Sequence, residues 1–470
     1  MLAFFKINDP FRMVGIILLF LLLRIPYILM DIPLTQTELL WQLIGERMAK
    51  GEWMYIGIID DTGPFSSLIY LINHYFSSNS LLSFRIISFC IVLFQVFYTN
   101  DLLIKLNAYD EHNYLPAFVM ILLFQLSFDF LSLSPGLMGS TFILLSFGQL
   151  LKQTAMNQNS SSSILLMGLF GGAAFCFHFP FLAFLPFLLL TGIFINRYSL
   201  QQLLLSVMGY LLPLFLCGLF YFWMDHLMAF IDIYFNLSRK LNIQQHVSYM
   251  DLLYLFLLPV LLALIGYFRN NVLGRMNNNQ QKQNQLFILY LIFSAGMFLF
   301  INRLAPYQFI VMLPALTYFI NHILVLNQKR LVQNVIFYSY LMLIPFMAYS
   351  WSFYKTNDDS FENYIIKTAE KHELPLKTSV MVLGNDIHYY LRSEPASPYI
   401  NFPLSHMYLQ AQEENEKLLR IYRDITSENP GYIIDPNGLF KLWMEKIPKL
   451  NERYQEEVEG RFKHLKNDTE

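Results

Sequence analysis

The sequence predicts a mostly α-helical protein, in which a polytopic bundle of membrane helices is followed by a small α/β domain. Hydrophobic residues make up 55% of the 470 residues and charged residues only 14%, whereas soluble domains are about 45–50% apolar. Uncharged apolar runs of about 18 residues or more recur along residues 1–354, and runs of that length can cross a bilayer. From about residue 355 to residue 470, the composition becomes that of an ordinary soluble domain.

We expect about eleven membrane spans, of which the first covers residues 12–30. Its apolar run is long and lacks a small-residue cleavage site, so we expect a retained span rather than a signal peptide. Residues 64–76 are apolar but too short to span, which favours an interfacial or re-entrant helix. The other spans are expected at 80–104, 115–132, 136–152, 162–178, 181–196, 200–223, 251–268, 285–302, 304–325 and 332–353.

Basic residues in the short loops predict the orientation in the membrane. Lys6 and Arg12 precede the first span, and further Lys and Arg residues fall in alternate loops, which the positive-inside rule places in the cytoplasm. The N-terminus is therefore expected to be cytoplasmic. The loops 31–79 and 224–250 and the C-terminal domain are expected on the extracytoplasmic side of a bacterial-type inner (plasma) membrane.

Net charge and cysteine positions argue against several classes of function. The formal net charge is −2, whereas a nucleic-acid partner would require a basic surface. The three cysteines, Cys90, Cys176 and Cys217, all lie in apolar runs far apart in the sequence. This spacing predicts neither a disulfide framework nor a zinc site, so we expect them to be packing residues.

The C-terminal residues 355–470 are expected to form the α/β domain. The segment TSVMVLG (378–384) is typical of a buried strand, and PGYIIDPNG (430–438) of a second strand that ends in a turn. Helices are expected over IHYYLR (387–392) and over 408–425. Neither a G-x-G-x-x-G nor a Walker sequence is present, so a nucleotide site is not predicted.

Glu38, Asp60 and Asp61 are the leading candidates for chemistry in the loop after the first span. A carboxylate beside a low-dielectric wall can have its pKa shifted enough to accept a proton from a hydroxyl group. The alternative for Glu38 is structural, because Thr35 and Glu38 have the spacing of a capping box at the start of a helix over 38–50. The paired aspartates could bind a divalent cation or a sugar hydroxyl, or could simply shape a turn.

The same loop carries a resemblance to a known superfamily. Glu38, Met48, Gly51 and Trp53 follow one another at intervals of ten, three and two residues. This arrangement resembles the first extracytoplasmic loop of the GT-C-fold glycosyltransferases, such as protein mannosyltransferases and aminoarabinose transferases. The resemblance implies a polytopic enzyme of the cell envelope that transfers a sugar from a polyprenyl-phosphate carrier, with that carrier and membrane lipid as partners.

The resemblance also assigns roles to residues of the loop. The family loop begins with an Asp-Glu pair whose Asp acts as general base or orients the acceptor, but here Thr37 occupies the Asp position. Glu38, Asp60 and Asp61 are therefore the expected catalytic acids. Some members carry a lysine that meets the carrier phosphate, and here Gly63 stands in its place.

Phosphate recognition is expected from four other residues. Arg303 is a lone cation between two spans on the extracytoplasmic side, and a guanidinium matches a phosphate in bidentate geometry. Arg303 and Tyr307 resemble the Arg-x-x-x-Tyr stretch that opens a late span in related transferases. Arg24 lies inside the first span and Arg85 near the outer start of the second. Intramembrane charges are functional candidates by default, although both arginines could snorkel to the interface.

Two further expectations concern the extracytoplasmic face. The loop 224–250 is long enough for an amphipathic interfacial helix in which Phe230, Tyr234 and Phe235 face lipid. Asp129, at the outer end of the third span, is expected to be a surface acid.

Other functions remain open from the sequence. Because Thr37 and Gly63 replace the expected acid and lysine, the fold could serve as an inactive scaffold or carrier-binding subunit. A transporter or a polysaccharide polymerase-like protein is a third class, but transporters usually place their charges at mid-membrane, and here the charges gather at one face. The sequence does not predict the sugar, the acceptor, the oligomeric state or a definite cofactor, with a divalent cation as the one option.

Overall fold

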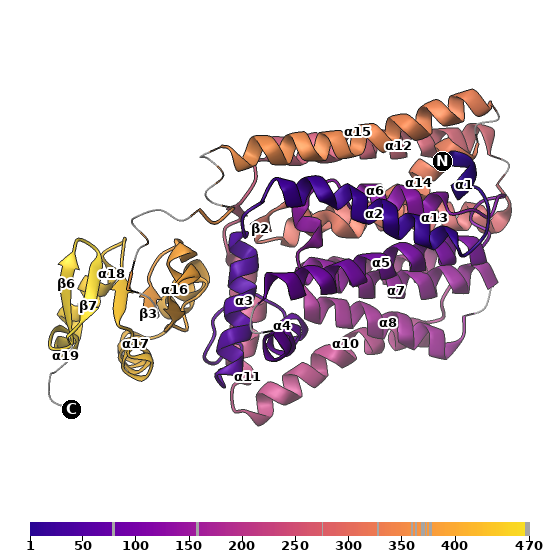
Figure 1. Ribbon diagram of the computed structural model, residues 1–470. Coiled ribbons are helices and arrows are strands. Elements are labelled where there is room, and N and C mark those ends of the chain that lie inside the picture. Colours follow the sequence, from indigo (N-terminus) through magenta and orange to yellow (C-terminus); the bar gives the residue numbers. More distant parts are fainter. Residues whose placement is uncertain are drawn as a thin grey trace. The chain divides into compact units, whose positions relative to one another are not determined.

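The computed structural model describes residues 1–465 except 78–79, 157–158, 275, 327–328, 359–360, 362–363, 368–371, 373 and 376–377, and Figure 1 shows its helices and strands. The chain packs as two compact units, each formed from three separate stretches of sequence. Unit 1 comprises Met1–Ile32, Leu81–Cys217 and Ile243–Phe361, and unit 2 comprises Pro33–Ser80, Gly218–Asn242 and Glu362–Glu470.

Unit 1 is a bundle of helices in which α7 packs along α8 and α12 along α14 (Figure 1). Apolar side chains fill it; Leu115–Leu123, for example, is buried along its whole length. Its helices are α1 (Leu2–Phe5), α2 (Arg12–Leu29), α5 (Leu81–Lys105), α6 (Leu115–Leu123), α7 (Pro135–Met156), α8 (Ser161–Phe177), α9 (Phe184–Phe194), most of α10 (Leu200–Trp223), α12 (Tyr249–Leu273), α13 (Asn278–Gly296), α14 (Leu313–Val325) and α15 (Arg330–Thr356).

Seven helical segments in the described residues are long and apolar enough to cross a membrane. They are Arg12–Leu29, Leu81–Lys105, Leu200–Trp223, Tyr249–Val272, Asn278–Phe300, Pro306–Val325 and Arg330–Thr356. The four other expected spans coincide with α6, α7, α8 and α9, which are shorter or less apolar. The prediction of a polytopic helix bundle with a small C-terminal α/β part is thus confirmed.

Glycines on α8 allow a neighbouring helix to approach closely. A Cβ atom at Gly172 would lie 2.0 Å from the carbonyl oxygen of Tyr210 on α10, and one at Gly168 would lie 2.3 Å from that of Ser206. Small residues four positions apart commonly let membrane helices pack backbone against backbone. The α8–α10 contact therefore requires glycine at both positions.

Several helices of unit 1 are interrupted by short 3-10 segments. These are η1 (Phe128–Leu131), η2 (Phe179–Ala183), η5 (Met297–Phe300) and η6 (Pro306–Met312). The segments cluster, because η1 packs against η6 and η2 against η5. Beside them, the two-residue strand β1 (Gln244–Gln245) pairs in parallel with β2 (Arg303–Leu304). Irregular backbone inside a membrane protein is tolerated only where protein or a water-filled cavity satisfies it.

Unit 2 contains the first loop, the segment 218–242 and the C-terminal residues. The first loop forms α3 (Gln36–Ala49) and α4 (Pro64–Ser77). These helices pack tightly, since a Cβ at Gly45 would lie 2.6 Å from the carbonyl oxygen of Tyr70. The loop is also joined to the C-terminal residues by backbone bonds, from the Gln36 N–H to the Tyr364 carbonyl and from the Ile366 N–H to the Leu34 carbonyl, both 2.8 Å long.

A five-stranded sheet of order β4-β3-β5-β7-β6 organises the C-terminal part of unit 2. Strand β3 is parallel to β4 and β5, and β7 is antiparallel to β5 and β6. The expected strands at 378–384 and 430–438 are confirmed as β3 and β5, and the expected helix at 387–392 is a 3-10 turn, η9. The elements are β3 (Ser379–Val382), η9 (Ile387–Leu391), β4 (Glu394–Pro395), α16 (Phe402–Gln410), α17 (Glu414–Glu428), β5 (Tyr432–Ile434), α18 (Leu439–Lys446), α19 (Pro448–Asn451), β6 (Tyr454–Val458) and β7 (Arg461–His464).

The segment 218–242 does not form the expected lipid-facing helix. It contains a single turn, α11 (Leu227–Phe230), the π-helix η3 (Ile231–Leu237) and a 3-10 turn, η4 (Ser238–Lys240). Phe230 and Tyr234 are buried, and their rings lie 5.3 Å and 5.9 Å from the ring of Tyr55. The prediction that these two side chains face lipid is wrong, because the first loop supplies an aromatic partner that amphipathicity alone does not reveal.

Candidate functional site

Glu38 lies at the start of α3 in a capping box, as its spacing from Thr35 predicts. Its Oε2 accepts hydrogen bonds from the backbone N–H of Thr35 at 3.1 Å and from the Thr35 hydroxyl at 3.0 Å. The Thr35 hydroxyl in turn accepts the Glu38 N–H at 3.1 Å. Glu38 is buried, so this carboxylate has a structural task whatever else it does.

Asp60 is the most enclosed of the predicted acids, with no exposed surface. Its Oδ2 accepts the Thr62 N–H at 2.8 Å, which closes an Asx-type turn, and also the Thr62 hydroxyl. Its Oδ1 accepts a bond from the side-chain amide of Asn401 at 2.9 Å. The same amide lies 3.3 Å from Oδ1 of the less buried Asp61, so Asn401 holds both acids together.

Tyr55 stabilises the turn that carries these acids. Tyr55 has a φ of +66°, which costs energy for a residue with a Cβ. Its hydroxyl donates to the Thr62 carbonyl at 2.6 Å, and its ring packs against Tyr221 as well as Phe230. Aromatic packing thus holds the strained Tyr55 in contact with the acidic turn.

In unit 1, Arg303 and Tyr307 lie where the late helix is interrupted. Arg303 is buried within the short strand β2, so it does not project into lipid. The backbone N–H of Tyr307 donates to Oδ2 of Asp129 at 3.0 Å. Asp129 is itself only 2% exposed; the expectation of a surface acid is wrong, because the carboxylate satisfies a backbone donor at the start of η6.

Arg24 is also buried rather than snorkelling outward. Its guanidinium donates to the carbonyl of Phe124, at the end of α6, at 2.9 Å, while its Nε is buried and has no hydrogen-bond partner among the described residues. Asp129 and Arg85 are both close enough to Arg24 to interact with it electrostatically. Arg85 is exposed.

His178 and Gln308 extend this group. His178, between α8 and η2, lies 2.5 Å from the side-chain oxygen of Gln308 through its Nε2, and Arg303 is within electrostatic range of it. The Gln308 amide donates to the Tyr307 hydroxyl at 3.4 Å. We call this connected set the polar cluster of unit 1; its members are Arg24, Arg85, Asp129, His178, Arg303, Tyr307 and Gln308.

The predicted site residues therefore fall into two sets. The four predicted phosphate ligands all belong to the polar cluster of unit 1, and the three predicted acids, Glu38, Asp60 and Asp61, belong to unit 2. Among the described residues, neither Asp60 nor Asp61 is part of a group of three or more side chains that could hold a metal ion.

Sequence reasoning missed Asn401 and Gln308. Asn401 is the N-cap of α16, with a proline in the first turn, so the Asn-Phe-Pro sequence does signal a helix start. Nothing local signals its bond to a turn 341 residues earlier. Gln308 has no sequence signal, because its partner His178 comes from another interrupted helix.

Comparison with known proteins finds similarity only among solved structures, where eight chains match. No protein-family model matches the sequence, and no curated protein matches it. Among solved structures, the chain is similar to the crystal structure of ArnT from Cupriavidus metallidurans bound to undecaprenyl phosphate, with a TM-score of 0.46 and 12% sequence identity. The match covers 66% of this chain and 59% of that one, so the chain spans well under two thirds of that structure.

Proposed function

We propose that this protein is a membrane glycosyltransferase that transfers a sugar from a polyprenyl-phosphate carrier to an extracytoplasmic acceptor, which is a glycan, a lipid or a protein. The observation that supports the proposal is the polar cluster of unit 1. It contains three guanidinium groups and one carboxylate, at the point where four helices are interrupted. Two of the three guanidinium groups, those of Arg24 and Arg303, are buried, and buried cations in a membrane bundle are costly and typically mark a functional site.

The chemistry of the cluster fits an anionic phosphate. A guanidinium group can donate two parallel hydrogen bonds to two oxygens of one phosphate, and it remains charged at all physiological pH values. The buried Nε of Arg24 is a donor without a partner in the part of the chain that the structure describes, and Arg303 is held in place by β-pairing to the segment at Gln244. In the proposed reaction, these cations stabilise the negative charge that grows on the departing carrier phosphate.

The acceptor hydroxyl requires a base, for which the proposed residues are Glu38, Asp60 and Asp61. Asp61 is the best placed by environment, since it is partly exposed, whereas Asp60 is completely buried and accepts hydrogen bonds from Thr62 and Asn401. The reaction would be a direct displacement at the anomeric carbon, in which the acceptor oxygen forms the new bond, the carbon–phosphate oxygen bond breaks, and the base takes the acceptor proton.

We further propose the arrangement in the membrane that this reaction needs. The N-terminus is cytoplasmic, and the soluble domain over 355–470 and the first loop are extracytoplasmic. This orientation follows from the distribution of basic residues in the loops.

Carrier binding is the direct test. Purified full-length protein in lipid nanodiscs is titrated with a polyprenyl phosphate and, separately, with the corresponding polyprenol. We expect preference for the phosphate, and a loss of at least about tenfold in phosphate affinity for Arg303→Ala and for Arg24→Ala. The exposed Arg330→Ala variant, at the start of α15, is the matched control. Equal binding of both lipids, or wild-type affinity in both cluster variants, contradicts the proposal.

A catalytically inactive scaffold or carrier-binding subunit is the second candidate. It is favoured by the capping box at Glu38 and by the hydrogen bonds that fully engage Asp60. This second function would be supported if the protein binds polyprenyl phosphate but does not cleave a polyprenyl-phosphate sugar in the presence of any of several acceptors.

A further inference from the structure

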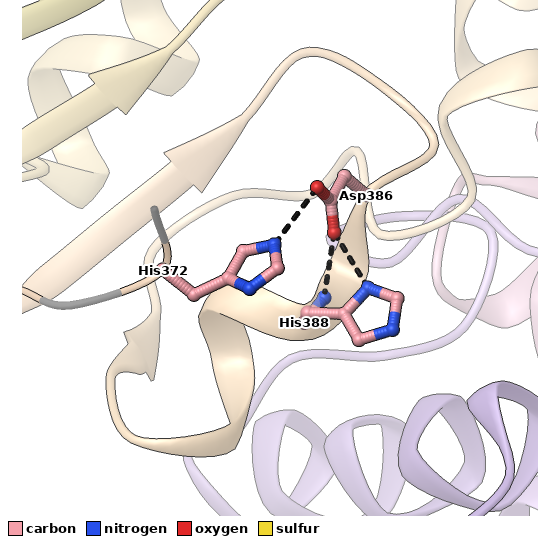
Figure 2. Close-up of side chains that lie close together, drawn as sticks. All are labelled: His372, Asp386 and His388. Carbon is pink, nitrogen blue, oxygen red and sulfur yellow. Dashed lines mark hydrogen bonds and ion pairs between the residues drawn. The ribbon is translucent and has the colours of Figure 1, made fainter. Parts of the chain in front are cut away.

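Two histidines and one aspartate gather in the C-terminal part of unit 2 (Figure 2). Asp386 and His388 lie in the turn after β3, where Asp386 is the N-cap of η9. His372 precedes β3 in the chain. Figure 2 shows both imidazole rings pointing toward the carboxylate of Asp386, one on each oxygen.

The distances are short. His372 Nε2 lies 3.0 Å from Asp386 Oδ2, and His388 Nδ1 lies 2.6 Å from Asp386 Oδ1. All three residues offer a ligand atom within 4.8 Å of the others. In a four-coordinate zinc site the Zn–N and Zn–O bonds are about 2.0–2.2 Å, which puts neighbouring ligand atoms about 3.3–3.5 Å apart. The two contacts to Asp386 are shorter than this, and no ligand atom is more than 4.8 Å from another, so small side-chain movements would give the three atoms the spacing of a coordination shell.

The ligands are also held in place. The two imidazole rings stack with centroids 5.1 Å apart and an angle of 19° between their planes, and the rings of Tyr389 and His372 pack in a T-shaped arrangement with centroids 4.8 Å apart. Both histidine side chains are no more than 10% exposed. Burial would raise the pKa of Asp386, but hydrogen bonds from His388 and His372 outweigh it and hold that pKa below its usual range.

We propose that His372, Asp386 and His388 bind one divalent transition-metal ion, for which Zn²⁺ is the expected ion. Two imidazole nitrogens and one carboxylate oxygen match the ligands of zinc, whereas Ca²⁺ and Mg²⁺ prefer oxygen ligands alone. Three protein ligands leave a fourth position for water or for a substrate group. The ion takes the place of the hydrogen bonds between the two imidazoles and Asp386, so each ring must present a nitrogen lone pair to it.

The site does not depend on the proposed glycosyl transfer. It lies entirely within the C-terminal part of unit 2 and includes none of the residues proposed as base or phosphate ligand. The metal would tie the chain before β3 to the turn after it, and so would stabilise this part of the unit.

The test uses full-length protein purified without a polyhistidine tag, stripped with a chelator and titrated with Zn²⁺ by calorimetry. Metal content is then measured after desalting, and Co²⁺ is titrated with detection of its visible absorption. We expect one ion per chain, and a loss of at least about tenfold in affinity for His372→Ala, His388→Ala and Asp386→Asn. His406→Ala, which removes another histidine of the same unit that lies outside the cluster, should bind as wild type does.

Folding is checked independently of binding. The melting temperature of each variant is measured with and without Zn²⁺; Asp386→Asn keeps the size of the side chain and serves where an alanine variant does not fold. If the site binds Zn²⁺, the ion raises the melting temperature of wild type and of His406→Ala but not that of the cluster variants. Absence of binding in wild type, or equal affinity in wild type and Asp386→Asn, would show a hydrogen-bonded network only and overturn the proposal.

Discussion

The side-chain amide of Asn401 donates to Asp60 Oδ1 at 2.9 Å, and the oxygen of the same amide accepts the N–H of Leu404 at 3.4 Å as the N-cap of α16. One asparagine therefore connects the acidic turn of the first loop to a helix of the C-terminal part of unit 2. Because Asp60 is completely buried, the loss of this partner leaves part of its charge unsatisfied, which is costly.

Replacement of Asn401 should destabilise unit 2. For Asn401→Ala we expect a loss of about 1–3 kcal/mol, since it removes a cap and a hydrogen bond to a buried carboxylate. Asn401→Asp keeps the cap but places a second negative charge beside Asp60, so its loss should be larger. Chemical denaturation in nanodiscs measures both, with the exposed Asn451→Ala as the control. A wild-type midpoint for Asn401→Asp would contradict this prediction.

The two aspartates of the turn should respond differently to amidation. Asp60→Asn introduces a donor where Oδ2 accepts two bonds from Thr62, so we expect reduced stability together with reduced transfer. Asp61→Asn should leave stability within about 0.5 kcal/mol of wild type, while transfer falls strongly if Asp61 is the base. Melting temperature and sugar transfer measured on the same preparations separate the two effects. Full transfer by Asp61→Asn would remove this residue from the list of bases.

Local patterns predicted those features that depend on local physics. The capping box at Thr35 and Glu38 was predictable because its partners are three residues apart. The strands β3 and β5 were predictable because short apolar runs are bounded by turn residues. Seven of the expected spans coincide with helices that are long and apolar enough to cross a bilayer, because length and apolarity can be judged within one segment.

Partners that are distant in the sequence were not predictable. Hydrophobicity shows that Phe230 and Tyr234 need burial, but it does not distinguish lipid from the ring of Tyr55 as the partner. Likewise, Asp129 is followed by turn residues that are typical of a surface, yet it accepts a backbone N–H from Tyr307. A pattern in one segment reports which face is apolar or polar, and the identity of the opposing surface comes only from the fold.

Glu38 offers a test that separates structure from catalysis. Glutamine is tolerated at this position of a capping box, so Glu38→Gln should change stability by no more than about 0.5 kcal/mol, whereas Glu38→Ala should cost about 1 kcal/mol. If Glu38 is the base, both variants lose transfer to a similar degree, because an amide cannot accept the proton. Unchanged transfer by Glu38→Gln would confine this residue to its capping role.

Arg47 links three parts of unit 2 through buried charge. It is only 1% exposed and pairs with two carboxylates: it lies 2.5 Å from Glu428 Oε1 through one nitrogen and also contacts Glu52. Its other terminal nitrogen donates to the Pro395 carbonyl at 3.0 Å. One guanidinium cannot fully neutralise two carboxylates. Burial raises the pKa of Glu52 to about 7; Arg47 opposes the rise and Glu428 adds to it.

This pKa predicts that unit 2 loses stability as pH rises. Between the ordinary value of 4.5 and about 7, the folded protein holds the Glu52 proton more tightly than the unfolded chain does, so the free energy of unfolding falls as pH rises through that window and levels off above it. Because Glu52 is partly exposed, solvent screening reduces the effect below the full shift, and the loss should amount to about 1–2 kcal/mol.

The side chain in Glu52→Gln is uncharged at every pH. The melting temperature of this variant, measured from about pH 5 to about pH 8, should therefore depend less on pH than that of wild type. Glu457→Gln, at an exposed position of β6, should retain the wild-type dependence and controls for the loss of a carboxylate. If the wild-type protein instead gains stability relative to Glu52→Gln over this range, the ion pair with Arg47 outweighs the burial of Glu52, and the carboxylate is ionised in the folded state.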